Sequence, residues 1–348
     1  MPATLSADRI DAQLCYLLVT PIGPVAPANS PEAIPRRLRD APYFTPTDID
    51  IRLIGSETID VEGVRVSILR QSFDGLAQMA ECHFTLPDVL SVDTLQVKAR
   101  VQAGLKARLI ADRQALGNMT EEYMVLMLKT IEGTPDEFID RHGQALARFI
   151  RSQHEVFGPR EVEQILVSRV RYSQADLTVV DWEGAVIISP EGDFQSDIEL
   201  LKIGNYQLLR YRLLDQTLER NLQTVSDNLQ TGTRASLLPN RPKRVLRQVI
   251  EQRLEIMLDF EKIDQSLLLI GDWYTAKVYK VIYDEFYLDE WKSAIRSKLD
   301  NLESIVQIIQ ENFTFSWSRF LEMVQIAGWL LLLVGYFVLY FLEAGKSK

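Results

Sequence analysis

The chain has 348 residues, of which 47% are hydrophobic and 25% are charged, and its formal net charge is −10. This composition is typical of a folded protein with one large or two small cores, and the acidic balance excludes a general nucleic-acid binder, whose phosphate contacts require a basic surface. Cys15 and Cys82 are too few and too far apart to indicate a disulfide framework or a CxxC zinc or redox site.

The first part of the chain, residues 1–195, is predicted to be a mixed α/β cytoplasmic domain. Half of the 14 prolines fall within residues 21–46, which predicts an extended arm or linker there. Alternating or β-branched runs predict strands at residues 12–19, 49–55, 64–71 and 79–86, and strand character returns at 175–193. Helices are predicted at residues 92–116, 121–131 and 135–153.

Long helical patterns follow and predict an antiparallel, coiled-coil-like stalk over residues 196–314. In its last helix, apolar residues recur with a heptad spacing, which favours a seam that could be satisfied within one chain or between chains. The residues expected to form an oligomerisation seam are Leu288, Trp291, Ile295, Leu302, Ile305 and Ile309. In the first stalk helix, Arg212 and Asp215 are expected to pair and fix the helix register, with a polar site inside the bundle as the alternative.

A basic cluster stands out between the first and second stalk helices. We expect it to contact anionic lipid headgroups, with a phosphate-bearing nucleic-acid or ribosomal partner as the alternative. Its members are Arg234, Arg241, Lys243, Arg244 and Arg247.

The last part of the chain is predicted to be a single transmembrane helix, residues 315–343, followed by a short basic tail, residues 344–348. No charged residue occurs from Met323 to Leu342, and a helix of that length would cross the hydrocarbon layer. The N-terminus lacks the basic and apolar regions of a signal peptide, so the bulk of the chain is expected in the cytoplasm and the helix in the inner membrane. The residues expected at the anchor are Trp317, Glu322, Gly328, Trp329, Gly335, Tyr336 and Tyr340.

Signatures of catalysis are sparse. The chain has no GxGxxG, GxxxxGK[ST], GxSxG or HExxH motif. Cys82 and His83 are adjacent, but neighbouring strand residues point to opposite faces, so we expect a buried cysteine beside a surface histidine and not a metal site. Asp181 and Glu183 form the only suggestive acidic pair, and a turn usually leaves such a pair solvated. We therefore expect no enzyme, no cofactor and no bound metal.

The C-terminal half resembles the YagE / RMND ("required for meiotic nuclear division") family. The similarity covers residues 176–340, and the matching positions are Trp291, Lys298, Leu299, Leu321 and Glu322. The resemblance implies a membrane-attached protein that assembles into large homo-oligomers, supports translation in eukaryotic mitochondria, and has no established catalytic activity.

The sequence therefore predicts an α+β, single-pass membrane protein that acts as a non-enzymatic, homo-oligomeric scaffold or adaptor. Its expected partners are membrane lipid, further copies of itself, and a protein or ribosomal partner. Two alternatives stay open. One is an oligomeric ion channel like the CorA magnesium channels, although only Gly117-Asn118-Met119 is reminiscent of their Gly-Met-Asn motif. The other is an enzyme that works from the α+β domain.

Overall fold

The computed structural model describes residues 12–22, 49–111, 119–235, 254, 257–258 and 273–346. Within helices, the side chains of residues 111, 224–235, 305–321, 337 and 339–346 lie outside the description. The chain divides into two compact units. Unit 1 comprises residues 1–215 and 259–294, and unit 2 comprises residues 216–258 and 295–348.

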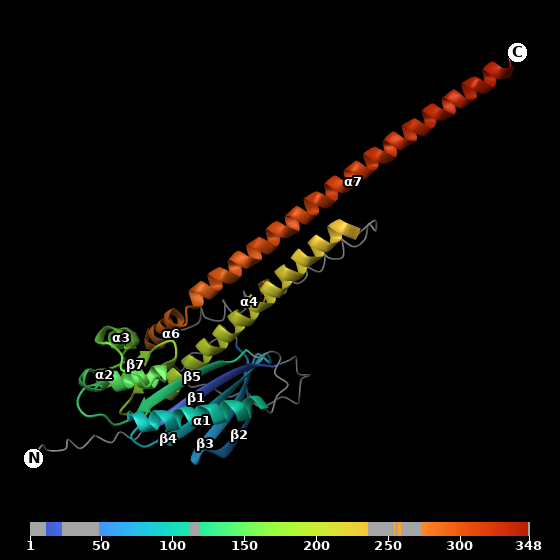
Figure 1. Ribbon diagram of the computed structural model, residues 1–348. Helices are drawn as coiled ribbons and strands as arrows, with labels where there is room; N and C mark the ends of the chain where they lie inside the picture. The colour runs from blue at the N-terminus through green and yellow to red at the C-terminus, as the bar shows by residue number, and fades with distance from the viewer. Residues whose placement is uncertain are drawn as a thin grey trace, which may run out of the picture. The chain divides into compact units, whose positions relative to one another are not determined.

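Unit 1 is built on a mixed sheet of eight strands in the order β2-β3-β4-β1-β5-β8-β7-β6 (Figure 1). The strands are β1 (Ala12–Pro21), β2 (Ile51–Val61), β3 (Val64–Phe73), β4 (Ala77–Leu86), β5 (Glu121–Leu128), β6 (Arg169–Val170), β7 (Leu177–Val180) and β8 (Gly184–Ile188). β5 and β8 run parallel, and the other neighbouring strands are antiparallel.

Tight turns set the register of the strands β2, β3 and β4. Glu62 and Gly63 join β2 to β3, and Asp74 and Gly75 begin the turn from β3 to β4; all four have positive φ. Pairs of left-handed residues suit hairpin turns because their twist matches that of the strands. The short connections place β2, β3 and β4 side by side.

Helices cover both faces of the sheet and make a three-layer α/β/α sandwich. One face packs against α1 (Val92–Ala111), α2 (Pro135–Arg151) and α3 (Pro159–Ile165), through even-numbered β1 residues such as Leu14 and Tyr16. The other face meets the first half of α4 (Gln195–Ala235) and α6 (Trp273–Glu285), whose side chains bond to strand residues on that face. Side chains alternate across a strand, so central strands such as β1 and β5, which are buried on both sides, contribute to two cores.

The strands predicted at residues 12–19, 49–55, 64–71 and 79–86 are confirmed as β1 to β4. The helices predicted at 92–116 and 135–153 correspond to α1 and α2. The helix predicted at 121–131 is wrong, since this segment is the central strand β5. β5 is apolar and buried along nearly its whole length, and such a run has no period that separates a buried strand from a buried helix.

α7 (Leu288–Lys346) is a continuous helix of 59 residues that begins in unit 1 and continues through unit 2. Within unit 2, Lys298 Nζ lies 2.7 Å from Glu219 Oε2 of α4. Leu218 and Leu302, also of this unit, are buried. The helical character predicted for residues 196–314 is present in α4, α6 and the first part of α7. The middle of that range, residues 236–272 with the predicted second stalk helix, lies outside the described residues apart from 254, 257 and 258.

The predicted single transmembrane helix needs correction. Among the residues described, no helix combines the length and the apolar character that a membrane span requires. The fold class with a transmembrane helix, the single-pass topology and the inner-membrane location are therefore not supported.

Candidate functional site

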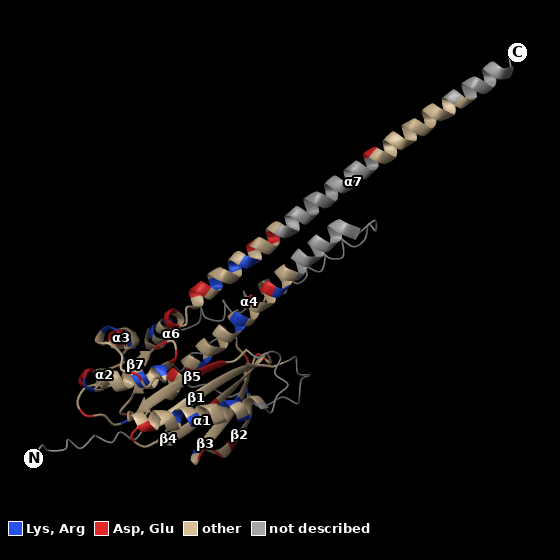
Figure 2. Ribbon diagram, viewed as in Figure 1, with Lys and Arg blue, Asp and Glu red and all other residues tan. Residues whose placement is uncertain are grey.

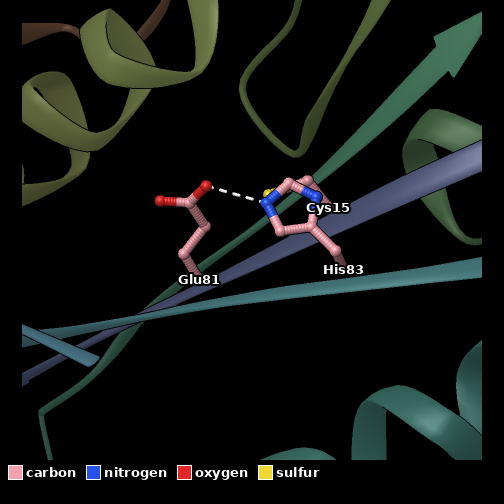
Figure 3. Close-up of side chains that lie close together, drawn as sticks. All are labelled: Cys15, Glu81 and His83. Carbon is pink, nitrogen blue, oxygen red and sulfur yellow. Dashed lines mark hydrogen bonds and ion pairs between the residues drawn. The ribbon is translucent and has the colours of Figure 1, made fainter. Parts of the chain in front are cut away.

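A cluster of polar side chains lies on the α4 face of the sheet, where the strands β1 and β4 pair. Cys15 of β1 and His83 of β4 are direct partners in the antiparallel register, and Glu81 precedes His83 by two residues. Residues two apart on a strand share a face, so all three side chains lie on the same side of the sheet (Figure 3). We call Cys15, Glu81 and His83 the strand triad.

The side chains of the strand triad converge. The Nε2 atom of His83 lies 2.7 Å from Oε1 of Glu81. The Sγ atom of Cys15, a carboxylate oxygen of Glu81 and a ring nitrogen of His83 all lie within 4.8 Å of one another. Cys15 and Glu81 are fully buried, whereas the His83 side chain is 38% exposed. Within the triad, the protein therefore covers Cys15 and Glu81, and only the imidazole of His83 reaches solvent.

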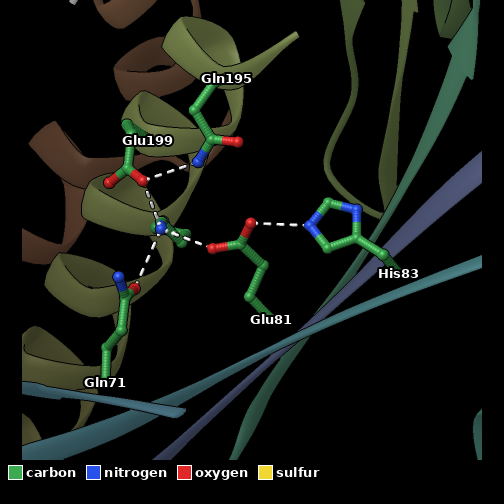
Figure 4. Close-up of polar contacts among 6 residues, drawn as sticks. Gln71, Glu81, His83, Gln195 and Glu199 are labelled. Carbon is green, nitrogen blue, oxygen red and sulfur yellow. Dashed lines mark hydrogen bonds and ion pairs between the residues drawn. The ribbon is translucent and has the colours of Figure 1, made fainter. Parts of the chain in front are cut away.

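Lys202 of α4 holds the other oxygen of Glu81. Its ammonium donates to Glu81 Oε2 at 2.6 Å, to Glu199 Oε1 at 2.5 Å and to Gln71 Oε1 at 3.0 Å (Figure 4). Lys202 is 0% exposed, and these bonds compensate the cost of burying its charge. Gln195 donates to Glu199 at 2.9 Å and extends the network along the helix.

The network shifts the pKa values of its members in opposite directions. Burial raises the pKa of Glu81, but the hydrogen bond from His83 and the Lys202 ammonium outweigh it and leave that pKa at about 2. Burial lowers the pKa of Lys202, and Glu199 and Glu81 more than restore it, so the lysine stays charged. Burial and the negative charge of Glu81 raise the pKa of the Cys15 thiol well above 9.0. A thiol held protonated is a poor nucleophile, so a cysteine–histidine nucleophilic pair is disfavoured here.

A polar hollow of about 330 Å³ opens elsewhere in unit 1, around the start of β5. It is lined by Glu121, Glu122 and Tyr123 of β5, Arg212 of α4 and Trp182, among others. Arg212 donates to Glu121 Oε1 at 2.5 Å, so the arginine faces the sheet. The sequence predicts that Arg212 pairs with Asp215 of the same helix. In the structure the arginine instead joins α4 to Glu121 of β5.

The acidic pair Asp181 and Glu183 is engaged by an arginine. Arg151 lies 2.8 Å from Asp181 Oδ1 and 3.6 Å from Glu183 Oε1. The backbone N–H of Glu183 also donates to Asp181 Oδ2 at 3.1 Å. These contacts join the C-terminal end of α2 to the turn between β7 and β8.

The residues of the predicted oligomerisation seam fall into three groups. Leu288, Ile295 and Leu302 are buried within a single chain, and Trp291 is half-buried. The side chains of Ile305 and Ile309 lie outside the described residues. The buried members are already covered by their own chain, so they are not available to a second copy.

The remaining predicted sites are also only partly described. At the expected anchor, Glu322, Trp329 and Tyr336 are exposed, and Gly328 and Gly335 have open space around them. The side chains of Trp317 and Tyr340 lie outside the description. So does the whole basic cluster, namely Arg234, Arg241, Lys243, Arg244 and Arg247.

Sequence reasoning treated His83 with its neighbour Cys82 and missed Cys15. The structure places Cys82 in the core under α1 to α3 and His83 on the opposite face, in agreement with the alternation expected of a strand. The spacing Glu81-x-His83 is the one local signal for the triad. Cys15 lies 68 positions earlier, and only the register of β1 on β4 brings it there.

Comparison with known proteins matches the family described as "Uncharacterized protein MJ0711, N-terminal domain" over residues 61–195. The chain is also similar to the protein of that name from Methanocaldococcus jannaschii, with 25% identity over 188 residues. That match covers 54% of this chain and 57% of the archaeal protein, so the chain spans little more than half of its relative. No solved structure matches. The resemblance to the YagE / RMND family is wrong on these findings, because the supported similarity is to a different family and lies toward the N-terminal half.

Proposed function

We propose that this protein is a non-enzymatic scaffold or adaptor that assembles as a homo-oligomer through the apolar part of α7. The observation that carries the proposal is the exposed apolar surface of the described residues after Glu322. The large apolar side chains there are 51% to 75% exposed. They are Met323, Val324, Ile326, Trp329, Leu330, Leu331, Leu332, Leu333, Val334, Tyr336 and Val338. From Met323 to Tyr336 the helix carries no lysine, arginine, aspartate or glutamate (Figure 2).

An apolar surface of this extent favours burial against other protein. Each leucine-sized side chain contributes about 1.5–3 kcal/mol when it is fully buried. Monomeric soluble proteins rarely expose contiguous apolar patches larger than a few hundred Å², and larger patches mark interaction sites. The apolar residues include the consecutive run Leu330–Val334, which surrounds the helix and does not follow one stripe. A helix that is apolar all round needs neighbours on several sides.

Further copies of this chain are the partner that fits best. Closed symmetric oligomers are the commonest assemblies, and a bundle of identical helices gives each one neighbours on more than one side. Gly328 and Gly335 lie one heptad apart, and an added Cβ at either position meets nothing within 4 Å. Identical helices could therefore approach closely along that line. The protein or ribosomal partner expected from the sequence stays a prediction.

Light scattering coupled to size exclusion tests the proposal on the full chain. One chain has a mass of 39.8 kDa. We expect a discrete species of roughly three or more chain masses, because a dimer would cover only one side of α7. Replacing Leu330 and Val334 together by Glu, one helical turn apart, should reduce the mass to that of one or two chains.

The matched control places the same substitutions elsewhere. Val156 and Val167 are exposed valines of unit 1, at 74% and 63%, and changing both to Glu should leave the mass unaltered. A wild-type mass of one chain would refute the proposal. A broad distribution that grows with concentration would refute it as well, since unspecific association has no defined stoichiometry.

A further inference from the structure

We propose that the strand triad, Cys15, Glu81 and His83, is a binding site for one divalent transition-metal ion, with Zn²⁺ the best-suited ion. The inference goes beyond the proposed scaffold function and is independent of it. The triad belongs to the sheet of unit 1, whereas the proposed assembly surface belongs to α7 in unit 2.

The geometry of the triad is close to that of a metal centre. Zn²⁺ binds sulfur at about 2.3 Å and nitrogen or oxygen at about 2.0–2.2 Å, so tetrahedral ligand atoms lie roughly 3–4 Å apart. The three candidate donor atoms lie within 4.8 Å of one another. Rotation of the His83 ring and the Glu81 carboxylate by small angles would bring them onto one ion. Two paired strands carry all three residues, so the backbone is already ordered for binding.

The donor set selects the class of metal. One thiol sulfur, one imidazole nitrogen and one carboxylate oxygen suit a borderline-soft cation such as Zn²⁺. Ca²⁺ and Mg²⁺ prefer oxygen ligands and would gain little from the cysteine or the histidine. Three protein ligands leave a fourth tetrahedral position for water or another small ligand.

The surroundings of Glu81 support its role as a ligand. Lys202 and Gln71 approach from α4 and β3, and the lysine bonds to Oε2 of Glu81, while Oε1 faces His83. Lys202 thus orients the carboxylate, as partners of metal ligands commonly do, and leaves Oε1 directed at the proposed ion. A divalent cation and the Lys202 ammonium would balance Glu81, Glu199 and a Cys15 thiolate. The buried cluster would then carry no net charge, which favours binding in a place of low dielectric.

An entry path exists on the histidine side. Cys15 and Glu81 are buried, and the His83 side chain is 38% exposed. An ion can therefore reach the triad from solvent without the opening of the sheet, and His83 would be its first ligand.

Cobalt binding to the full chain tests the proposal directly. The protein, with tags removed and thiols reduced, is freed of metal with a chelator and titrated with Co²⁺ alone. We expect one Co²⁺ per chain, with the visible bands of tetrahedral cobalt and a near-ultraviolet thiolate-to-cobalt charge-transfer band. One equivalent of Zn²⁺ should remove both. X-ray absorption of the zinc-loaded protein should show one sulfur ligand, with nitrogen and oxygen ligands completing the shell.

Matched variants identify the ligands. Cys15→Ala should abolish the charge-transfer band, whereas Cys82→Ala, the same change at the other buried cysteine, should keep it. His83→Gln should weaken Co²⁺ binding at least about tenfold, which is the lower end of what even supporting partners of a metal contribute. His154→Gln is the control at an exposed histidine and should bind as the wild type does.

The outcomes discriminate. Absence of a sulfur ligand in the wild type, or a charge-transfer band that survives in Cys15→Ala and disappears in Cys82→Ala, would overturn the metal site. Should Cys15→Ala fail to fold, the zinc absorption spectrum and the half-exposed His83→Gln decide the matter. The oligomer mass is a separate readout, so failure of the scaffold proposal would leave this result interpretable.

Discussion

Two lysines of unit 1 are almost fully buried, and their surroundings give them opposite properties. Lys202 meets the carboxylates of Glu81 and Glu199. Lys98 donates instead to the carbonyl of Phe149 and, at 2.9 Å, to the hydroxyl of Ser152, which are neutral groups. Burial therefore lowers the pKa of Lys98 to about 7, with Glu183 opposing the shift, while Lys202 keeps its charge.

The lowered pKa of Lys98 predicts a pH-dependent stability. The folded-state pKa, about 7, lies below the ordinary value of 10.5, so between these pH values the unfolded chain binds more protons. The free energy of unfolding should then rise with pH in this range, by up to about 1.4 kcal/mol per pH unit. Below pH 7 the lysine is charged in the folded protein as well, so the full cost of burying that charge lowers the stability. Lys98→Met removes this dependence. The variant should therefore be the more stable protein at pH 6, and its advantage in the free energy of unfolding should shrink as the pH rises to 10. Urea unfolding over this range measures both proteins, and a difference that stays constant with pH would contradict the prediction.

Removal of the Lys202 charge should be costly for a different reason. Lys202→Met leaves Glu81 and Glu199 without their cation in a buried place, which typically costs about 3–5 kcal/mol. The control is Lys280→Met, which breaks an exposed ion pair with Asp284 on α6 and should change stability by less than about 1 kcal/mol. Urea unfolding of both variants measures the difference. Equal losses would show that the buried network contributes no more than a surface pair.

At the scale of the elements, α4 depends on a glycine where it packs in unit 1. A Cβ added at Gly204 would lie 2.4 Å from Cγ2 of Ile282 on α6 and 3.1 Å from the ring of Phe286. Alanine normally stabilises a helix interior by up to about 1 kcal/mol relative to glycine. At Gly204 the overpacking should dominate and destabilise by about 1–3 kcal/mol.

Gly143→Ala is the matched control for Gly204→Ala. Gly143 is also helical, and an added Cβ there would lie 3.3 Å from its nearest neighbour, Cγ1 of Val162. Thermal unfolding should show a clearly lower Tm for Gly204→Ala and a smaller change for Gly143→Ala. An increase at both positions would mean that helix propensity outweighs the contact with α6.

At the scale of the whole molecule, assembly through α7 should change the surroundings of Trp329. This side chain is 69% exposed in the single chain. If identical helices surround it, its fluorescence should shift to shorter wavelength, because burial removes water from the indole. The emission of wild type minus that of Trp329→Phe isolates its contribution. We expect the difference spectrum to lie at short wavelength in the assembled protein.

Trp273 provides the comparison. It is 64% exposed, belongs to unit 1, and has the Lys277 ammonium over its ring. The difference between wild type and Trp273→Phe should keep the long-wavelength emission of a solvated indole. A solvated spectrum for Trp329 as well would argue against assembly through this part of α7.

The sequence alone determined those elements whose pattern is local. β2, β3 and β4 have alternating or branched runs separated by turn residues. α2 carries its own start signal, since Thr134 and Glu137 form a capping box and Pro135 takes the first helical position. The amphipathic and heptad patterns likewise predicted the helices α4 and α7. The absence of nucleotide-binding and hydrolase motifs also follows from the sequence directly.

Tertiary structure decided what depends on pairing between distant segments. β5 was predicted as a helix because a strand buried on both faces has no alternation, and only its hydrogen bonds to β1 and β8 fix its type. The strand triad depends on the same kind of information. The register of β1 on β4 places Cys15 beside His83, and a slip of one residue would turn Cys15 to the opposite face and bring Tyr16 in its place. A sequence pattern encodes which face a residue takes within its own strand, whereas the partner across the sheet follows from the packing of the whole domain.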